Sequence, residues 1–397
     1  MTSTPGRADD GVDDDDVDDD DGVDDGAAHS RWAAAPQGQD GARLDLPWAD
    51  LERLLVVAAH PGDETLGAEA LIAQATAFGL EVHVVLLAGG RTCHPHSPTD
   101  PPERPAQPRL AESEAALRLL APRARLTHLD PPCGRVSECD AAVDAVVRAV
   151  GERGTRTLLC APGQHGHPDH EDAGRIARTA AYRTDALLID PSRPGHWGPP
   201  AQAPDDPFEL LHRDAEDPWG VATRWYERRK RQVTLAALPG PRYRRALEVG
   251  CSVGALAAEL AQRCDEVLAI DGSATAVERA NATLASLATA RAMRMTVPAQ
   301  WPEGTFDLIV LSEVGYFLSP RQLHALMGRV AGSLEPGGAL VLCHWLHPIT
   351  GWPLDGQRVH DRARAALGRA PDVVHREADF LLEVYGGCGP AGEQQRP

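Results

Sequence analysis

Short apolar runs alternate with amphipathic helical stretches twice along this chain, and that alternation constrains its fold more than any other feature. Parallel sheets covered by helices on both faces produce this pattern, because their strands are buried on both sides and joined by crossover helices. The first series comprises Leu54–Ala59, a helix from Gly67, Glu81–Leu87, a helix near Arg109–Leu120, Asp140–Gly151 and Thr157–Ala161. The second comprises Arg244–Val249, Glu266–Asp271, Asp307–Ser312 and Ala339–His344. The chain is therefore predicted to belong to the α/β class.

Two changes in composition divide the chain. Twelve Asp lie between Asp9 and Asp25, so residues 1–45 have too little apolar surface to fold and are predicted to form a disordered acidic tail. A Pro/Gly-rich stretch at 191–207 indicates an interdomain linker. The two series share no repeat, and 397 residues exceed one ordinary core. We therefore expect two different Rossmann-like parallel-sheet domains in tandem, at 50–192 and 213–388, with 193–212 as the linker.

Charge and cysteine usage exclude several classes of protein. The net charge is −19, and the only basic cluster, 228–231, is short, so nucleic acid is not expected as a partner. No apolar run approaches the ~20 residues of a membrane span, and the N-terminus lacks an apolar signal core, so we expect a cytoplasmic protein without a membrane partner. Eight Cys without a CxxC pair indicate reduced thiols, so any zinc would be held by His and Asp.

Residue types that bind metals follow two buried-type strands of the first series, at 60–64 and at 165–170. Open α/β sheets bind ligands at the carboxyl ends of their strands, so these two clusters are expected to converge. Catalytic zinc takes three protein ligands from His and carboxylate and keeps a fourth position for water. His60, Asp63 and His170 would suffice for such a site.

Residues about 52 to 190 resemble the LmbE/PIG-L family of zinc-dependent N-deacetylases, through the AHPxDE segment at 59–64 and the HPDH segment at 167–170. The resemblance implies a substrate among N-acetylglucosaminyl compounds and their relatives. The zinc ligands that it implies are His60, Asp63 and His170. It also implies that His167 stabilises the tetrahedral oxyanion, and Asp169 is a candidate to orient a neighbouring imidazole.

The sequence departs from this family at one position. Gly62 stands where the family has the first Asp of AHPDDE, which is the general base for the zinc-bound water. Because glycine has no side chain to accept a proton, Glu64 or a group of the substrate would have to take this role. The alternative is that the first domain is a catalytically weak module that binds zinc or a sugar.

A glycine-rich turn, EVGCSVG at 248–254, connects a strand of the second series to a helix. Such a turn lets the backbone approach a ligand, and Asp271 at the end of the next strand stands where an acidic group accepts hydrogen bonds from a ribose. Ser252 replaces one glycine of the dinucleotide pattern, which argues against NAD. An ordinary strand-to-helix turn is the structural alternative.

This spacing resembles that of class I S-adenosylmethionine (SAM)-dependent methyltransferases. Residues about 215 to 388 resemble more closely the NodS-like methyltransferases, which N-methylate an amino sugar. The segments that carry this resemblance are 225–230 (WYERRK), 343–348 (CHWLHP), 353–356 (PLDG) and 377–384 (EADFLLEV). SAM is therefore the implied cofactor. The predicted cofactor-binding residues are Glu248, Gly250, Cys251, Gly254, Asp271 and Ser312.

Methyl transfer to an amine requires an aligned acceptor whose nitrogen is neutral. Candidates to orient or deprotonate the amine lie on or after the ends of the strands Asp307–Ser312 and Ala339–His344: Glu313 and His344 foremost, then Tyr316 and His347. Aromatic residues that would cover the cofactor or sugar, or else belong to the core, are Trp225, Tyr226 and Trp345. The charged run 227–231 would approach the methionine carboxylate or form a solvated helix face.

The two implied reactions are sequential, because removal of an N-acetyl group exposes an amine. We therefore predict a bifunctional deacetylase and N-methyltransferase whose small-molecule substrate is an amino sugar or a glycosylated metabolite. The alternative is a SAM-dependent methyltransferase with a catalytically weak zinc- or sugar-binding module. A scaffold with two inactive domains is disfavoured, because both sets of candidate residues are nearly complete.

Overall fold

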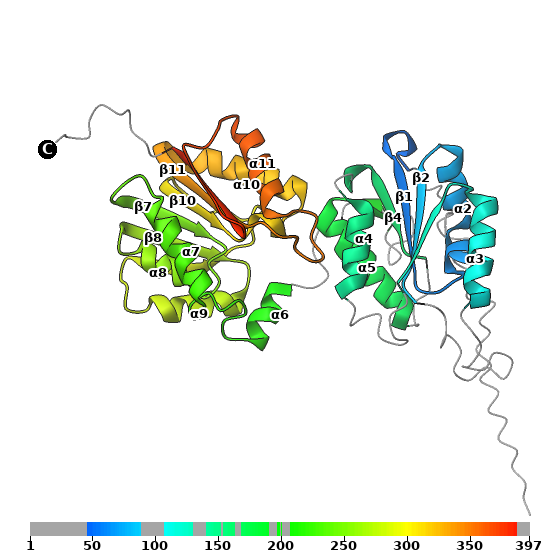
Figure 1. Ribbon diagram of the computed structural model, residues 1–397, viewed down its shortest axis with the longest axis horizontal. Coiled ribbons are helices and arrows are strands. Elements are labelled where there is room, and N and C mark those ends of the chain that lie inside the picture. Colours follow the sequence, from blue (N-terminus) through cyan, green and yellow to red (C-terminus); the bar gives the residue numbers. More distant parts are fainter. Residues whose placement is uncertain are drawn as a thin grey trace, which may run out of the picture.

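The computed structural model describes residues 46–88, 107–129, 140–151, 154–162, 168–189, 197–198, 200 and 207–386, which form two α/β domains (Figure 1). The tail predicted at 1–45, the candidate His167 and most of the Pro/Gly-rich stretch lie outside the described residues. None of the described helices is long and apolar enough to cross a bilayer.

The first domain is built on a sheet with the strand order β3-β2-β1-β4-β5-β6. Its strands are β1 Arg53–Ala58, β2 Glu81–Leu86, β3 Arg125–His128, β4 Thr157–Cys160, β5 Leu187–Ile189 and β6 Trp197–Gly198. Neighbouring strands are parallel, except that β6 runs antiparallel to β5. The strand order reverses between β1 and β4, and such a switch point is where open α/β sheets bind ligands.

Helices cover both faces of this sheet (Figure 1). They are α2 Asp63–Ala77 and α3 Gln107–Leu120 on one face, and α4 Asp140–Val150 and α5 Pro168–Thr184 on the other; the 3-10 turns are η1 Trp48–Asp50 and η3 Gly154–Arg156. Strand β1 explains the two layers. Its Leu54 and Val56 pack with α2 and α3, whereas Leu55 and Val57 pack with α4 and α5. All four are fully buried, as expected for a strand covered on both faces.

Helix α2 begins at Asp63, earlier than the predicted start at Gly67. Gly62 adopts φ 106°, which turns the chain directly from the end of β1 into the helix. Acidic residues then occupy the first turn, where the helix dipole favours negative charge. As a result, Asp63 belongs to a helix end and not to a loop.

The second domain is built on a sheet with the strand order β12-β13-β11-β10-β7-β8-β9. Its strands are β7 Tyr243–Val249, β8 Cys264–Asp271, β9 Ala290–Arg294, β10 Phe306–Ser312, β11 Leu334–Trp345, β12 Val373–Arg376 and β13 Phe380–Gly386. Strands β7 to β11 are parallel, and β12 and β13 are joined antiparallel at one edge. The predicted fold class is confirmed: both described sheets are mostly parallel. Their antiparallel edge strands were not predicted.

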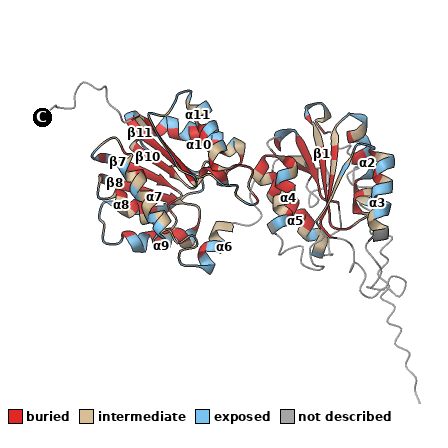
Figure 2. Ribbon diagram, in the orientation of Figure 1, coloured by how far each residue is buried: buried red, intermediate tan, exposed pale blue. Residues whose placement is uncertain are grey.

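The helices of the second domain are α6 Pro207–Asp214, α7 Trp225–Ala236, α8 Ala255–Leu260, α9 Ala274–Leu284, α10 Pro320–Ser333 and α11 Gly356–Leu367, with a 3-10 turn, η4, at Gly315–Phe317. They bury the central strands on both faces, as the red ribbons of Figure 2 show. Helix α6 overlaps the stretch assigned above to the linker, and it packs on α9 of the second domain. The switch point of this sheet lies between β7 and β10.

Candidate active sites

The predicted metal ligands converge at the switch point of the first sheet. His60 and Asp63 follow β1, and His170 lies in the first turn of α5, which follows the neighbouring strand β4. Among the described residues, these three form a group whose ligand atoms all lie within 4.8 Å of one another. The parallel pairing of β1 and β4 therefore brings together side chains that are more than a hundred positions apart in the sequence.

One oxygen of Asp63 is the centre of this cluster. Asp63 Oδ2 lies 3.1 Å from His170 Nε2 and 3.8 Å from His60 Nδ1. The other ring nitrogen of His60, Nε2, is 2.9 Å from Asp169 Oδ2, so Asp169 orients this imidazole with Nδ1 toward Asp63. Asp169 thus occupies the position expected of a carboxylate that supports a metal-binding histidine.

The electrostatics of the cluster suit a divalent cation. Burial lowers the pKa of His60, which favours the neutral imidazole that binds metals. Burial alone would raise the pKa of Asp63, but the hydrogen bond from His170 and the two nearby imidazoles outweigh it and hold that pKa below its usual value. Two imidazoles and one carboxylate are a ligand set of catalytic zinc, so the residues present fit this metal.

The candidate general base, Glu64, is buried and bound to the backbone of Gly62. Glu64 is fully buried, its Oε2 accepts a hydrogen bond of 3.0 Å from the Gly62 N–H, and burial raises its pKa. At Gly62 itself, a Cβ would meet no atom within 4 Å. The place where the LmbE/PIG-L family has an aspartate is therefore open space.

The glycine-rich turn of the second domain connects β7 to α8 in a conformation that requires glycine. Gly250 has φ 79°, and a Cβ there would lie 3.1 Å from the side chain of Val314. Asp271, at the end of β8, holds this turn: its carboxylate accepts hydrogen bonds of 2.9 Å from Ser252 N and 3.0 Å from Ser273 N. The predicted turn and its acidic partner thus form one unit at the carboxyl end of the sheet.

Three other predicted cofactor residues lie in or near this turn, at the carboxyl ends of β7 and β10. Glu248 is buried, burial raises its pKa to about 8, and its Oε2 has no hydrogen-bond partner among the described residues. Cys251 is buried within the turn, and Ser312 ends β10 half-buried. Glu248 Oε2 can accept a hydrogen bond from a ligand, and the turn at Gly250 lets a ligand approach the backbone closely. Together they fit a ligand that carries a hydrogen-bond donor.

Helix α6 brings two residues to this site that the sequence analysis missed. His212 Nε2 lies 3.0 Å from Ser252 Oγ. Glu209 accepts hydrogen bonds from Ser273 Oγ at 2.8 Å and Thr275 Oγ1 at 2.7 Å, and these bonds lower its pKa to about 2. The amphipathic segment after Pro207 was a signal of a helix, but its proline- and glycine-rich surroundings led to its assignment as linker.

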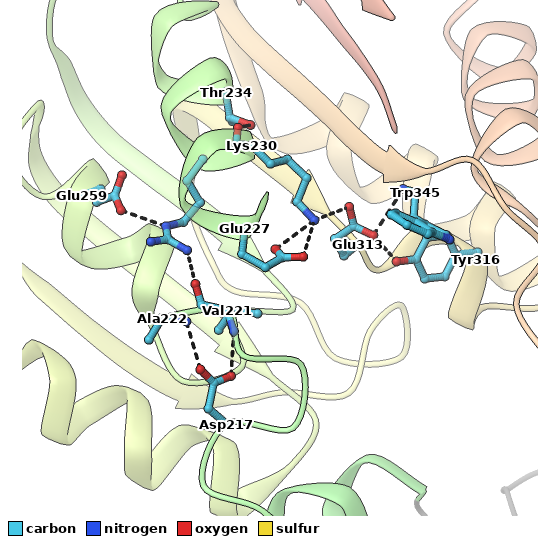
Figure 3. Close-up of polar contacts among 11 residues, drawn as sticks. Asp217, Val221, Ala222, Glu227, Lys230, Thr234, Glu259, Glu313, Tyr316 and Trp345 are labelled. Carbon is cyan, nitrogen blue, oxygen red and sulfur yellow. Dashed lines mark hydrogen bonds and ion pairs between the residues drawn. The ribbon is translucent and has the colours of Figure 1, made fainter. Parts of the chain in front are cut away.

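The acceptor candidate Glu313 belongs to a polar network that Figure 3 shows. Its Oε1 accepts from Lys230 Nζ at 2.8 Å, and its Oε2 accepts from Tyr316 Oη and from Trp345 N. Glu227 Oε2 is 2.9 Å from the same ammonium. Glu313 has φ 59°, an uncommon conformation for a residue with a side chain, and the network holds it there.

Lys230 is the only lysine in the sequence, and its side chain is only 5% exposed. Burial alone would lower its pKa, but the charges of Glu313 and Glu227 outweigh burial and raise it. Its neighbours Arg229 and Arg231 pair instead with Glu377 and Glu259. The run 227–231 is therefore not a uniformly solvated helix face.

We expect Lys230 to titrate above the ordinary lysine pKa of about 10.4. Because the folded-state pKa is raised, the stabilising pair with Glu313 is complete below the unfolded-state pKa and is lost only as the pH rises through the folded value. Protein labelled with 13Cε-lysine should give a single lysine resonance for this titration. Glu313→Gln should lower the measured pKa, whereas Asp361→Asn, on the exposed face of α11, should not; an equal shift in both variants would contradict the assignment.

The remaining acceptor candidates lie in different environments. His344 is buried, and both ring nitrogens have partners: Nε2 accepts from Gly315 N at 3.1 Å, and Nδ1 is 3.2 Å from His360 Nε2. Burial lowers the pKa of His344 well below its usual value. His347 is about half exposed and pairs with Asp379. His344 therefore supports the η4 turn, and its ring nitrogens do not face an open acceptor site.

Two of the three aromatic candidates pack together. The rings of Tyr226 and Trp345 are 5.5 Å apart in an edge-to-face arrangement next to Glu313. Trp225 is largely exposed on α7. The structure thus brings Tyr226, Trp345, Tyr316 and Glu313 together at the carboxyl ends of β10 and β11.

Comparison with known proteins identifies the two domains. Residues 55–181 match the family model "PIG-L: GlcNAc-PI de-N-acetylase", and residues 246–338 match the model of a methyltransferase domain. The chain therefore joins a PIG-L (LmbE-like) domain to a methyltransferase domain, and both predicted resemblances are confirmed.

The relatives of this chain include nodulation proteins. Nodulation protein S of Rhizobium tropici is 34% identical over 140 residues, which are 34% of this chain and 59% of that protein. The protein of the same name from Sinorhizobium fredii is 31% identical over 139 residues, which are 34% of this chain and 64% of that protein. The chain thus spans about three fifths of the length of these relatives.

A solved structure of N-methyltransferase NodS from Bradyrhizobium japonicum WM9, in complex with S-adenosyl-l-homocysteine, is 23% identical to this chain. The match covers 46% of this chain and 98% of that one, with a TM-score of 0.40.

Proposed function

We propose that the second domain transfers a methyl group from SAM to an amine, and that the first domain exposes this amine by removing an N-acetyl group. The observation that carries the proposal is the presence, in one chain, of two ligand sites of different chemistry at two switch points. One has the donor set of catalytic zinc, and the other has the turn and acidic partner of a nucleoside-type cofactor. The methyltransferase family match and the NodS-like sequence support the choice of reaction.

In the proposed methyl transfer, the protein binds and orients both partners. The carboxylate of Asp271 would accept from the ribose hydroxyls, the backbone at Gly250 would lie against the cofactor, and Glu248 Oε2 would accept from its amino group. SAM supplies an electrophilic methyl group on a sulfonium. Glu313 and Tyr316, which are hydrogen-bonded to each other, would orient the acceptor amine, which has to lose its proton before it attacks.

In the proposed deacetylation, His60, Asp63 and His170 would hold the zinc, and Asp169 keeps the His60 ring in its metal-binding orientation. Zinc, when bound, activates a water molecule and polarises the acetamide carbonyl. His167, which the family resemblance implies as the oxyanion-stabilising group, completes this proposal. An amino sugar or glycosylated metabolite bearing an N-acetyl group is the substrate class that both reactions share.

The test is mass spectrometry of products formed from N-acetylglucosaminyl compounds, with and without SAM. We expect loss of the acetyl mass without SAM, and a further gain of one or more methyl groups with it. Methylation of a free amino sugar without any deacetylation would support the second candidate, a methyltransferase with a zinc- or sugar-binding module. The observation that favours this second candidate is the empty general-base position at Gly62.

Gly62→Asp tests the missing base directly. An aspartate there would have open space, and general-base assistance is worth about 10²–10⁴ in rate, so we expect deacetylation to rise within that range. Because φ is 106° at this residue, we also expect a loss of roughly 1–3 kcal/mol in stability.

Gly79→Asp is the matched control, because Gly79 also has positive φ and open space but follows the C-terminal end of α2, whereas the cluster lies at its start. It should lose stability without any gain in rate. A stable, zinc-loaded Gly62→Asp protein with no gain over an active wild type would contradict the prediction and assign the base role to another group.

A further inference from the structure

Helix α5 connects the metal cluster to the methyltransferase domain. Its first turn carries Asp169 and His170, and its last turn carries Arg183, followed by Asp185. Seventeen helical residues span roughly 25 Å. Figure 1 shows α5, with α4, on the side of the first sheet that faces the second domain.

Arg183 contacts Gly351 and Trp352 in the segment that follows β11. Its Nη1 donates a hydrogen bond of 2.8 Å to Gly351 O, and its guanidinium lies 4.2 Å from the centre of the Trp352 ring. The Gly351 N–H donates to Asp144 Oδ1 on α4 at 3.0 Å. A Cβ at Gly351 would lie 2.7 Å from Arg183 Nη1, so the contact also requires glycine there.

Asp185 holds a second segment of the methyltransferase domain. Its carboxylate accepts from Ser319 Oγ at 2.6 Å and from Arg321 N at 2.9 Å, at the start of α10. Asp185 and Ser319 are both buried, so these hydrogen bonds are shielded from water. The η4 turn at 315–317 immediately precedes this anchor.

A series of aromatic contacts connects Trp352 to Tyr316, which lies beside the acceptor candidate Glu313. The Trp352 ring is 5.4 Å from that of Phe317, which is 4.6 Å from that of Tyr316. The Tyr316 hydroxyl donates to Glu313. Phe317 also packs at 4.7 Å on Phe208 of α6, the helix that contacts the glycine-rich turn.

We propose that Arg183 and Asp185, two residues of the first domain, position residues 313–319 of the methyltransferase site and so set its acceptor-binding geometry. Both residues hold the last part of this segment: Arg183 acts through Trp352 and Phe317, and Asp185 acts through Ser319. The expected effect on the methylation rate rests on the proposed function. The expected effect on the conformation of residues 313–319 does not. The first domain would in this sense contribute to the methyltransferase site.

The test uses the full chain and the variants Arg183→Ala, Asp185→Asn, Trp352→Ala and Trp352→Phe. Arg118→Ala, an exposed arginine on α3 that pairs with Glu114, is the control. Displacing a positioned group by 1 Å can cost about 10²-fold, so we expect kcat/KM for the acceptor to fall about 10- to 100-fold in the first three variants. SAM affinity and zinc content should stay within about twofold, and Trp352→Phe should recover most of the activity because it keeps an aromatic ring.

Hydrogen exchange of peptides covering 313–323 gives a readout that needs no activity. It should accelerate in Arg183→Ala and Asp185→Asn, and not in Arg118→Ala. If these two variants exchange faster but keep the acceptor kinetics of the wild type, the positioning role is overturned. The same holds if they lose thermal stability but keep normal activity per folded molecule. If the wild type methylates no acceptor, the proposed function fails, and unchanged exchange would then overturn this inference separately.

Discussion

Replacing Asp271 with alanine is expected to abolish measurable SAM binding while leaving the zinc content intact. The carboxylate has two roles in the proposed site: it holds the glycine-rich turn through Ser252 N and Ser273 N, and it would accept from the ribose. Hydrogen bonds to a charged group contribute roughly 1.5–3 kcal/mol each, so losing two corresponds to about a 10²–10⁴-fold weaker affinity. Isothermal titration calorimetry with SAM and with S-adenosylhomocysteine measures the loss.

Asp265→Ala is the matched control, because Asp265 lies on the same strand but is exposed and pairs with Arg242. It should bind SAM like the wild type. Gly250→Val should also lose binding, since a β-branched side chain is strained at φ 79° and would press against Val314. Unchanged affinity in both Asp271→Ala and Gly250→Val would show that the cofactor binds elsewhere.

The second large effect is expected at the metal cluster. The wild-type protein should contain about one zinc per chain, and His60→Ala or His170→Ala should remove nearly all of it, because two remaining ligands hold zinc poorly. Asp169→Asn should lower zinc affinity about 10- to 100-fold without emptying the site, because it changes only the support of His60. Metal analysis of the purified variants and a chelator competition measure these effects.

His83→Asn controls for the loss of any histidine in the first domain. His83 lies on β2, where its Nε2 is 2.9 Å from Thr127 Oγ1, and it is not part of the cluster. Its replacement should leave the zinc content unchanged. A wild-type protein without zinc, prepared under conditions that preserve zinc in related enzymes, would contradict the predicted site.

The sequence predicted the central strands and the two clusters because both depend on strongly local signals. The run 54–59 is continuously apolar, and its polar neighbours His60 and Asp63 come at its end, so the carboxyl-end rule was enough to bring them toward His170. The same holds for Gly250 and Asp271, whose spacing follows from one strand, one turn and one helix.

Features that depend on tertiary packing were not predictable in this way. Lys230 belongs to a helix rich in charge, and nothing in its local sequence distinguishes it from Arg229. Its burial and its pairing with Glu313, which follows β10, depend on how the helix packs on the sheet. His344 lies near the carboxyl end of a strand, close to where a ligand is expected, yet its ring nitrogens contact Gly315 and His360. Periodicity shows where a strand ends, but not which side chains form hydrogen bonds with neighbouring elements.

The position of α6 also affects where the chain can be cut without loss of the cofactor site. A methyltransferase domain begun at residue 213 would keep the whole sheet from β7 to β13, so we expect it to fold. It would lack His212 and Glu209, which contact the glycine-rich turn and the start of α9. Proteolytic cleavage just after α6 would therefore yield a folded but weakly binding fragment, whereas a cut before Pro207 would retain the complete cofactor site.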